Sequence, residues 1–167
     1  MKRLFVMDKK DYDPAMPRSR RPSARAIIFS GDKLAMVYSS RDRYYKFPGG
    51  GIEENESNEA ALIREVREET GLCVIPESIK EFGSVLRLKK STMFEECIFE
   101  QESFYYTCEV TDEISKTALD GYEIEEGFTL RYVTAEEAIE QNKQSLSEDS
   151  EMLIRENGVL ELVIKEK

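Results

Sequence analysis

The chain has 167 residues and a formal net charge of −10, from 34 acidic and 24 basic side chains. Its apolar content of 40% is enough for one sizeable core, and no segment approaches the roughly 20 apolar residues that a membrane-spanning helix needs. We therefore expect one domain over residues 1–167 and no membrane contact. The absence of histidine excludes Ser-His-Asp and Cys-His catalysis and all histidine-ligated metal centres.

Cysteine content and charge set two further expectations. The three cysteines form no Cys-x-x-Cys pair and no signal peptide precedes them, which favours the reducing cytoplasm. The acidic balance opposes a polyphosphate backbone, so nucleic acid is not an expected partner. One local group of basic residues lies among prolines and is more typical of a solvated linker than of a phosphate site; it consists of Arg18, Arg20, Arg21 and Arg25.

The first third of the chain predicts strands. Residues 1–8 have the pattern of an edge strand, and the Pro- and Arg-rich stretch up to residue 23 that of a connector. Two apolar runs, 26–29 and 34–38, are separated by a short turn in which Gly31 can adopt a positive φ. We expect these runs to form an antiparallel hairpin.

Three consecutive glycines, Gly49 to Gly51, predict a bent loop that leads into a helix, because glycine costs backbone entropy inside regular structure. Residues 57–70 contain no Gly or Pro, and Ser57 or Asn58 can cap their N-terminal end. Gly71 is well placed to end this helix.

The second half alternates strands and helices. Residues 82–88 and 98–110 predict strands, and a loop that contains Gly121 and Gly127 separates them from a strand over 128–133. Thr134 and Glu137 form a capping-box pattern for a helix over 135–142. A second helix, or one turn of it, is expected over 152–156, before an apolar stretch over 159–164. Strands on both sides of a central helix predict a mixed α/β layer structure.

Three glutamates on the central helix point to chemistry. Glu65, Glu68 and Glu69 have i, i+3 and i+4 spacing, which places their carboxylates on one helix face. Such like charges repel, and the last turn of a helix disfavours negative charge. A hard divalent cation would convert this repulsion into coordination, and Mg²⁺ favours phosphate oxygens as further ligands. Together with the glycine-rich loop, the trio predicts a site for a metal and a polyphosphate.

The spacing around this trio makes the prediction specific. Gly50, Glu56 and the run Arg64-Glu65-Val66-Arg67-Glu68-Glu69-Thr70-Gly71-Leu72 fill every defined position of the Nudix box. The chain therefore resembles the Nudix hydrolase (MutT-like) family. Flanking segments extend the resemblance to about residues 24–142, while residues 1–23 are expected to add an N-terminal strand and connector.

The resemblance implies a fold, a reaction and residue roles. The fold would be an α/β/α sandwich with a central mixed β-sheet, and the reaction would be hydrolysis of a nucleoside diphosphate linked to another moiety. Mg²⁺ or Mn²⁺ would bind to Glu65, Glu68 and Glu69, with Glu56 as an outer or additional ligand. Arg64 would hold the glutamates in place. Gly50 and Gly51 would shape the substrate loop.

The catalytic base and the substrate stay open at this stage. Glu65 is the first candidate for the residue that takes a proton from the metal-activated water, while Glu123, Glu125 and Glu126 in the later loop are rivals. Tyr45 or Phe47 could stack on a base, and Arg87 with Lys89 and Lys90 could meet phosphates, although each also has a purely structural interpretation. Neither the proline of ADP-ribose-cleaving relatives nor the tyrosine of dinucleoside-polyphosphate relatives is present after the box.

Two alternatives belong to other functional classes. A Nudix-like module could bind nucleotides or partner proteins without turnover, because a fold does not fix a function. An isomerase related to the isopentenyl-diphosphate branch would need a catalytic cysteine, and Cys73 is explained more simply as a small core residue. The expected partner is a small nucleotide derivative, and the formation of a homodimer stays open.

Overall fold

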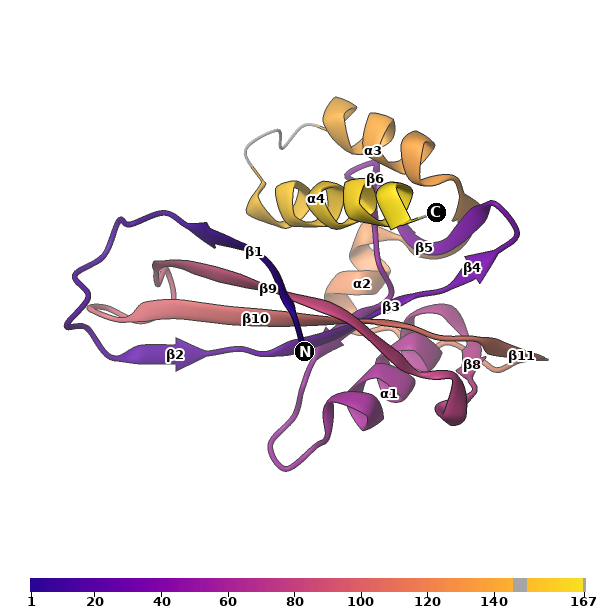
Figure 1. Cartoon of the computed structure of the whole chain (residues 1–167), viewed down its shortest axis with the longest axis horizontal. Helices are drawn as coiled ribbons and strands as arrows, with labels where there is room; N and C mark the ends of the chain where they lie inside the picture. Colours follow the sequence, from indigo (N-terminus) through magenta and orange to yellow (C-terminus); the bar gives the residue numbers. More distant parts are fainter. Residues whose placement is uncertain (146–149, 167) are drawn as a thin grey trace.

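The computed structural model describes residues 1–145 and 150–166, and Figure 1 shows how its helices and strands are arranged. A six-stranded sheet forms the centre. Its strand order is β1-β9-β10-β3-β7, with β2 also paired to β10. These strands are β1 (Arg3–Asp8), β2 (Arg18–Arg20), β3 (Ser23–Ile27), β7 (Gly49–Gly51), β9 (Lys80–Lys90) and β10 (Ile98–Thr107).

Two smaller sheets flank this centre. One has the order β12-β5-β4, with β6 also paired to β5, and the other pairs β11 with β8. Their strands are β4 (Phe29–Ser30), β5 (Lys33–Ser39), β6 (Tyr44–Lys46), β8 (Leu72–Val74), β11 (Val110–Ile114) and β12 (Phe128–Val133). The helices are α1 (Asn58–Thr70), α2 (Gly121–Glu126), α3 (Ala135–Gln144) and α4 (Glu151–Glu166), with one 3₁₀ turn η1 (Pro76–Ser78).

The central sheet is mixed and lies between helices. β1 runs parallel to β9 and β10 runs parallel to β3, whereas β9 with β10 and β3 with β7 are antiparallel. Alternate residues of β3 face opposite sides, so that Ala24 and Ala26 pack against α1 while Ile27 packs against α3 and α4. Figure 1 shows α1 below the sheet and the α3–α4 pair above it. The predicted α/β/α sandwich is confirmed.

Several sequence predictions hold in detail. The N-terminal strand lies at the sheet edge, and Gly31 has φ 63° in the turn between β4 and β5. Ser57 caps α1 by accepting a hydrogen bond from the Ala60 amide, and Gly71 ends α1 with φ 75°. The Thr134 and Glu137 side chains form the predicted capping box of α3.

Other predictions need correction. Gly49 to Gly51 form the short strand β7 rather than a loop, because β3 supplies an unpaired edge that satisfies their backbone groups. Residues 121–126 form the helix α2 between the two glycines predicted to lie in a loop. The segments 152–156 and 159–164 belong to the single helix α4, and part of the Arg/Pro connector forms β2.

Within residues 1–145 and 150–166, no helix is long and apolar enough to cross a membrane.

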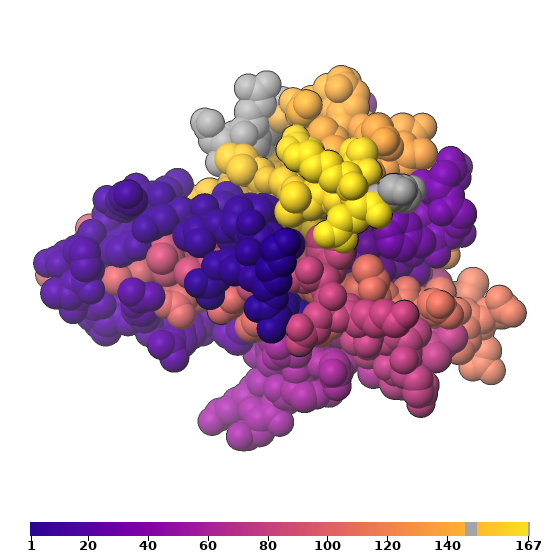
Figure 2. Space-filling view, in the orientation of Figure 1, coloured from indigo at the N-terminus to yellow at the C-terminus, as the bar shows by residue number. Residues whose placement is uncertain are grey.

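Figure 2 shows that residues from both ends of the chain meet on one face, where the indigo N-terminal segment lies beside the yellow α4. Phe5 of β1 contributes to this contact, since it packs against the core beneath α4 and lies directly over Gly158.

Candidate active site

Helix α1 presents its polar side next to β7. Ala61, Leu62 and Val66 are completely buried against the sheet, which fixes the rotation of the helix about its axis. The charged residues of the Nudix box therefore lie along the remaining side of α1, beside the glycine strand. The helix caps described above hold both ends of this arrangement in place.

Arg64 gathers three carboxylates at one point. Its Nε and Nη2 donate to the two oxygens of Glu56 at 2.8 Å each, and its Nη1 donates to Glu65 Oε1 at 2.7 Å and Glu68 Oε2 at 3.2 Å. Nη2 also donates to the Gly51 carbonyl at 3.0 Å. We call Glu56, Arg64, Glu65 and Glu68 the Arg64 cluster. Because Arg64 donates to Glu56 through two bonds, the pKa of Glu56 is lowered to about 2.

Glu65 lies directly against the glycine strand. A Cβ atom at Gly50 would lie 2.3 Å from Glu65 Oε2, so no residue larger than glycine fits there while Glu65 keeps its place. Burial raises the pKa of Glu65, while the neighbouring Arg64 partly offsets this rise. A raised pKa makes Glu65 better able to accept a proton than an ordinary exposed glutamate.

Glu69 is separated from the other glutamates of the box. It is buried, with 2% of its surface exposed, and accepts hydrogen bonds from Lys46 Nζ and from the Gly49 amide at 2.8 Å. Glu65, Glu68 and Glu69 all lie on α1 with the predicted spacing, but Glu69 forms an ion pair with Lys46 of β6 inside the protein. Within the described ranges, no group of three or more carboxylate or thiol side chains is already placed to hold a metal ion.

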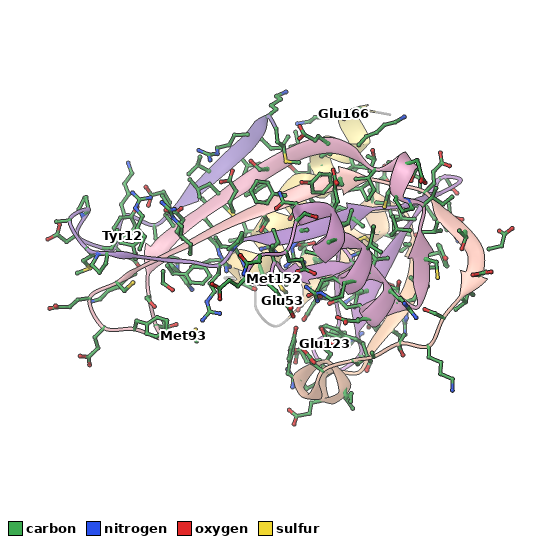
Figure 3. The ribbon with its side chains drawn as sticks, turned by 90° about the horizontal axis from the view of Figure 1, so that it is seen from below. Tyr12, Glu53, Met93, Glu123, Met152 and Glu166 are labelled. Carbon is green, nitrogen blue, oxygen red and sulfur yellow. The ribbon has the colours of Figure 1, made fainter. Side chains whose placement is uncertain are left out.

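Helix α2 brings Glu123 towards this region. Burial raises the pKa of Glu123, and the negative charge of Glu69 raises it further. One Glu123 oxygen accepts a hydrogen bond from the Asp120 amide at 2.8 Å, and the other accepts one from Tyr122 Oη at 3.1 Å. Figure 3 labels Glu123 on the short helix α2.

Glu126, another rival for the role of base, has a different environment. It accepts a hydrogen bond from Tyr44 Oη at 2.6 Å and forms an ion pair with Arg41 at 3.2 Å. These contacts tie Glu126 to the end of β5 and to β6. Glu123 thus senses the charge of Glu69, whereas the contacts of Glu126 are with Tyr44 and Arg41.

A second charged network lies on the opposite side of the glycine strand. Glu156 of α4 is fully buried and accepts hydrogen bonds from the Phe47 amide at 2.7 Å and from Arg155 Nη2 at 2.7 Å. Arg25 lies 3.9 Å from Glu156 and donates to the carbonyls of Phe47 and Gly49 at 3.4 and 3.3 Å. We call Arg25, Arg155 and Glu156 the α4 network. It holds the backbone that leads into β7.

Sequence reasoning did not identify this network as part of the site. Burial alone would raise the pKa of Glu156, but Arg155, Arg25 and the Phe47 amide more than offset it, so the pKa lies below the usual glutamate range. An Arg-Glu pair on an amphipathic helix is indistinguishable in sequence from a solvated pair. The one available signal was the strongly apolar composition of 152–164 around it.

Two residues predicted to bind substrate lie elsewhere. Tyr45 is buried, and its ring packs against Tyr38 with a centroid distance of 4.8 Å, so it is not available to stack on a base. Arg87 lies on the α4 side of the sheet, where it donates to Gln101 at 2.9 Å and lies 3.6 Å from Glu151. Burial and the nearby Arg155 lower the pKa of Arg87 to about 10.

Two surface cavities adjoin the site. One, of about 570 Å³, lies beside the Arg64 cluster and is lined by Ile63, Arg64, Arg67, Glu68 and Lys116, among others. The other, of about 460 Å³, lies on the far side of β7 and includes Gly51 in its lining. A Cβ atom at Gly51 would meet no atom within 4 Å, so this position opens into free space.

Comparison with known proteins gives a consistent result. Residues 19–155 match the sequence model of the NUDIX domain. Curated relatives include "RNA pyrophosphohydrolase" of Saccharophagus degradans, 44% identical over 50 residues that cover 28% of this chain and 29% of the relative. They also include "Putative 8-oxo-dGTP diphosphatase YtkD" of Bacillus subtilis, 43% identical over 64 residues that cover 38% and 39%. The matched segments thus span well under half of these relatives.

A solved structure extends the likeness to the fold. A NUDIX hydrolase from Nitrosomonas europaea aligns with a TM-score of 0.55 at 20% sequence identity, over 83% of this chain and 88% of that one. Because the identity is low, this likeness concerns the fold alone.

Proposed function

Because the chain belongs to the Nudix hydrolase family, we propose that it is a divalent-metal-dependent pyrophosphohydrolase. Its substrate would be a nucleoside diphosphate linked to another moiety, such as a nucleoside triphosphate or a nucleotide sugar. The names of the two curated relatives, an RNA pyrophosphohydrolase and a protein named for 8-oxo-dGTP, fit this class of reaction. The proposal treats residues 1–167 as a single Nudix domain; a cytoplasmic location and a homodimer stay predictions.

The observation that carries the proposal is the Arg64 cluster. Three carboxylates converge on one cationic group at hydrogen-bond distance, beside a strand without side chains. This donor set consists of hard oxygen ligands, which Mg²⁺ and Mn²⁺ prefer, so the residues present fit a divalent ion. Glu56, Glu65 and Glu68 would hold the ion, with Glu69 as a further ligand. When bound, the ion supplies charge neutralisation at the phosphates and a more acidic water.

The protein residues have separate tasks in this mechanism. Arg64 orients the carboxylates, since it reaches Glu56, Glu65 and Glu68 at once. Glu65 takes the proton from the attacking water, because it is half-buried and its pKa is raised. Glu123 is the rival base, with a pKa also raised by burial. Arg67 and Lys116, which line the cavity beside the cluster, provide positive charge for phosphate oxygens.

The test is a substrate panel with a metal requirement. Nucleoside triphosphates, nucleotide sugars, ADP-ribose, dinucleoside polyphosphates and coenzyme A are incubated with Mg²⁺, Mn²⁺ or EDTA, and released phosphate and nucleotide are measured. We expect cleavage of a phosphoric anhydride that stops in EDTA. Saturable binding without cleavage of any compound would instead favour the nucleotide-sensing module.

The base is assigned by a matched pair of variants. Glu65→Gln and Glu123→Gln each remove one carboxylate without changing side-chain shape. We expect the larger loss of kcat from Glu65→Gln, with similar KM values for the two variants. A nearly active Glu65→Gln enzyme beside an inactive Glu123→Gln enzyme would move the base to α2.

A further inference from the structure

The cavity on the far side of β7 has features of a recognition site. It lies between the basic arm before β3, the glycine strand and β10, and its lining includes Arg20, Arg21, Gly51, Met93, Phe99 and Gln101. Its volume of about 460 Å³ is in the range of small-molecule sites.

Gly51 links this cavity to the proposed catalytic groups. Its carbonyl accepts a hydrogen bond from Arg64 Nη2, and the position of its missing side chain is open. One residue of backbone therefore separates the cavity from the Arg64 cluster. A ligand whose phosphates lie at the cluster would extend past β7 into this cavity.

Phe99 gives the cavity a flat apolar wall. It stands on β10 and is half-buried, and the Arg87 guanidinium lies 5.0 Å from its ring centroid, with Lys89 Nζ at 5.8 Å. These cations hold the ring in place. An aromatic ring on a cavity wall is suited to stack on a planar heterocycle.

Gln101, two residues further along β10, has an amide whose orientation is fixed. Its Oε1 accepts hydrogen bonds from Arg87 Nη2 and Arg155 Nη1, both at 2.9 Å. Guanidinium groups only donate, so the atom that faces both must be the oxygen and not the nitrogen. Within residues 1–145 and 150–166, no hydrogen bond from Gln101 Nε2 to a protein atom is present. The amide therefore offers the cavity a donor.

We propose that this cavity binds the base of the substrate nucleotide and prefers a base with a keto group. This inference rests on the function proposed above. Phe99 stacks on the ring, and Gln101 Nε2 donates to the exocyclic oxygen. A base with an exocyclic amino group at the same position presents a second donor to Nε2 and loses this hydrogen bond. Arg20 and Arg21 also line this cavity, and their positive charge favours the approach of an anionic nucleotide.

The test compares bases that carry a keto oxygen with bases that carry an amino group at the same position, a change that also turns the adjacent ring N–H into an acceptor. Binding of inosine against adenosine monophosphate, and of uridine against cytidine monophosphate, is measured by calorimetry in EDTA. We expect the keto member of each pair to bind about tenfold more tightly, the order of one hydrogen bond. Equal binding within both pairs would overturn the proposal.

An isosteric variant reverses the predicted preference. Glutamate at position 101 still accepts from Arg87 and Arg155, but its second oxygen presents an acceptor to the cavity. In Gln101→Glu we expect the amino member of each pair to bind more tightly, while Gln144→Glu on α3 adds the same charge and keeps the original order. An unchanged order in Gln101→Glu would overturn the role of the amide.

A second variant tests the stacking wall separately. Phe99→Leu keeps an apolar side chain but removes the aromatic face, so all four monophosphates should bind several-fold more weakly with their order preserved. Unchanged affinities would overturn the role of Phe99. Because these measurements use no metal and no turnover, they fail independently of the proposed hydrolysis. A chain that hydrolyses its substrate without base preference would lose only the recognition proposal.

Discussion

The Arg64 cluster and the α4 network use the same chemical groups on opposite sides of the glycine strand, and they differ in access to water. Arg64 and its three carboxylates are partly exposed, with side-chain exposures between 15% and 39%. Glu156 and Arg155 are buried almost completely. An exposed set can exchange partners when a ligand arrives, whereas a buried set is costly to disturb. The first is therefore suited to chemistry and the second to holding the chain in position.

The largest effect is expected from a change in the Arg64 cluster. Glu68→Gln removes one charge of the Arg64 cluster, and turnover with Mg²⁺ should fall on the order of 100-fold because a proposed metal ligand is weakened. Steady-state kinetics over a range of Mg²⁺ concentrations measures this loss. Glu59→Gln, at the exposed start of the same helix, is the matched control and should keep its activity.

The second-largest effect is expected from a change in the α4 network. Glu156→Gln leaves Arg155 and Arg25 without their counter-charge, and the free energy of unfolding should fall by about 3–5 kcal/mol. Urea denaturation checks this, with Glu161→Gln on the exposed side of α4 as control. A stability loss as small as that of Glu161→Gln would mean that the buried pair is not structurally important.

The effect of divalent ions on thermal stability should distinguish the Arg64 cluster from the α4 network. An ion that binds only the folded chain stabilises it by about 2.7 kcal/mol at 100 times its dissociation constant. Mg²⁺ or Mn²⁺ should therefore raise the melting temperature of the wild-type protein relative to EDTA. Glu68→Gln should lose most of this increase, whereas Glu156→Gln, although less stable, should keep it. The same increase in both variants would place the ion away from the Arg64 cluster.

The smallest expected effect is a loss of folding stability at acidic pH. The folded-state pKa of Glu156 lies below the unfolded value of about 4.3, so its stabilisation is complete above that pH and is lost as the pH falls through the folded pKa. The Glu56 pKa of about 2 has the same sign, but its partly exposed position makes its contribution smaller and sensitive to salt. Unfolding curves between pH 5 and 2, at low and high salt, should show a salt-independent loss that Glu156→Gln lacks.

Local sequence signals were sufficient to predict the helix that carries most of the Arg64 cluster. Helix α1 could be predicted because Ser57 and Gly71 mark its ends, and the i, i+3, i+4 spacing places its glutamates close together. The separation of Glu69 from the others could not be predicted, because it depends on Lys46, which comes from β6. Helix α2 was missed because it is only six residues long and has glycine at both ends.

The buried set depends on contacts distant in sequence. Gly49 to Gly51 were expected to avoid a strand on grounds of backbone entropy, and only pairing with β3 changes that outcome. Glu156 meets the Phe47 amide across 109 residues, a contact that no local pattern encodes. The helix that carries the Nudix glutamates was thus easier to predict than the residues that fix the backbone beside it.

The contact between Glu156 and Phe47 also bears on how the protein matures during translation. The strand β7 and helix α1 can pair and cap soon after they are made, because their partners lie nearby in the sequence. The backbone before β7, however, receives its buried carboxylate only when residues 151–166 have left the ribosome and α4 has packed onto the sheet. A nascent chain that stops before α4 would carry every residue of the Nudix box and still lack the group that fixes the Phe47 amide.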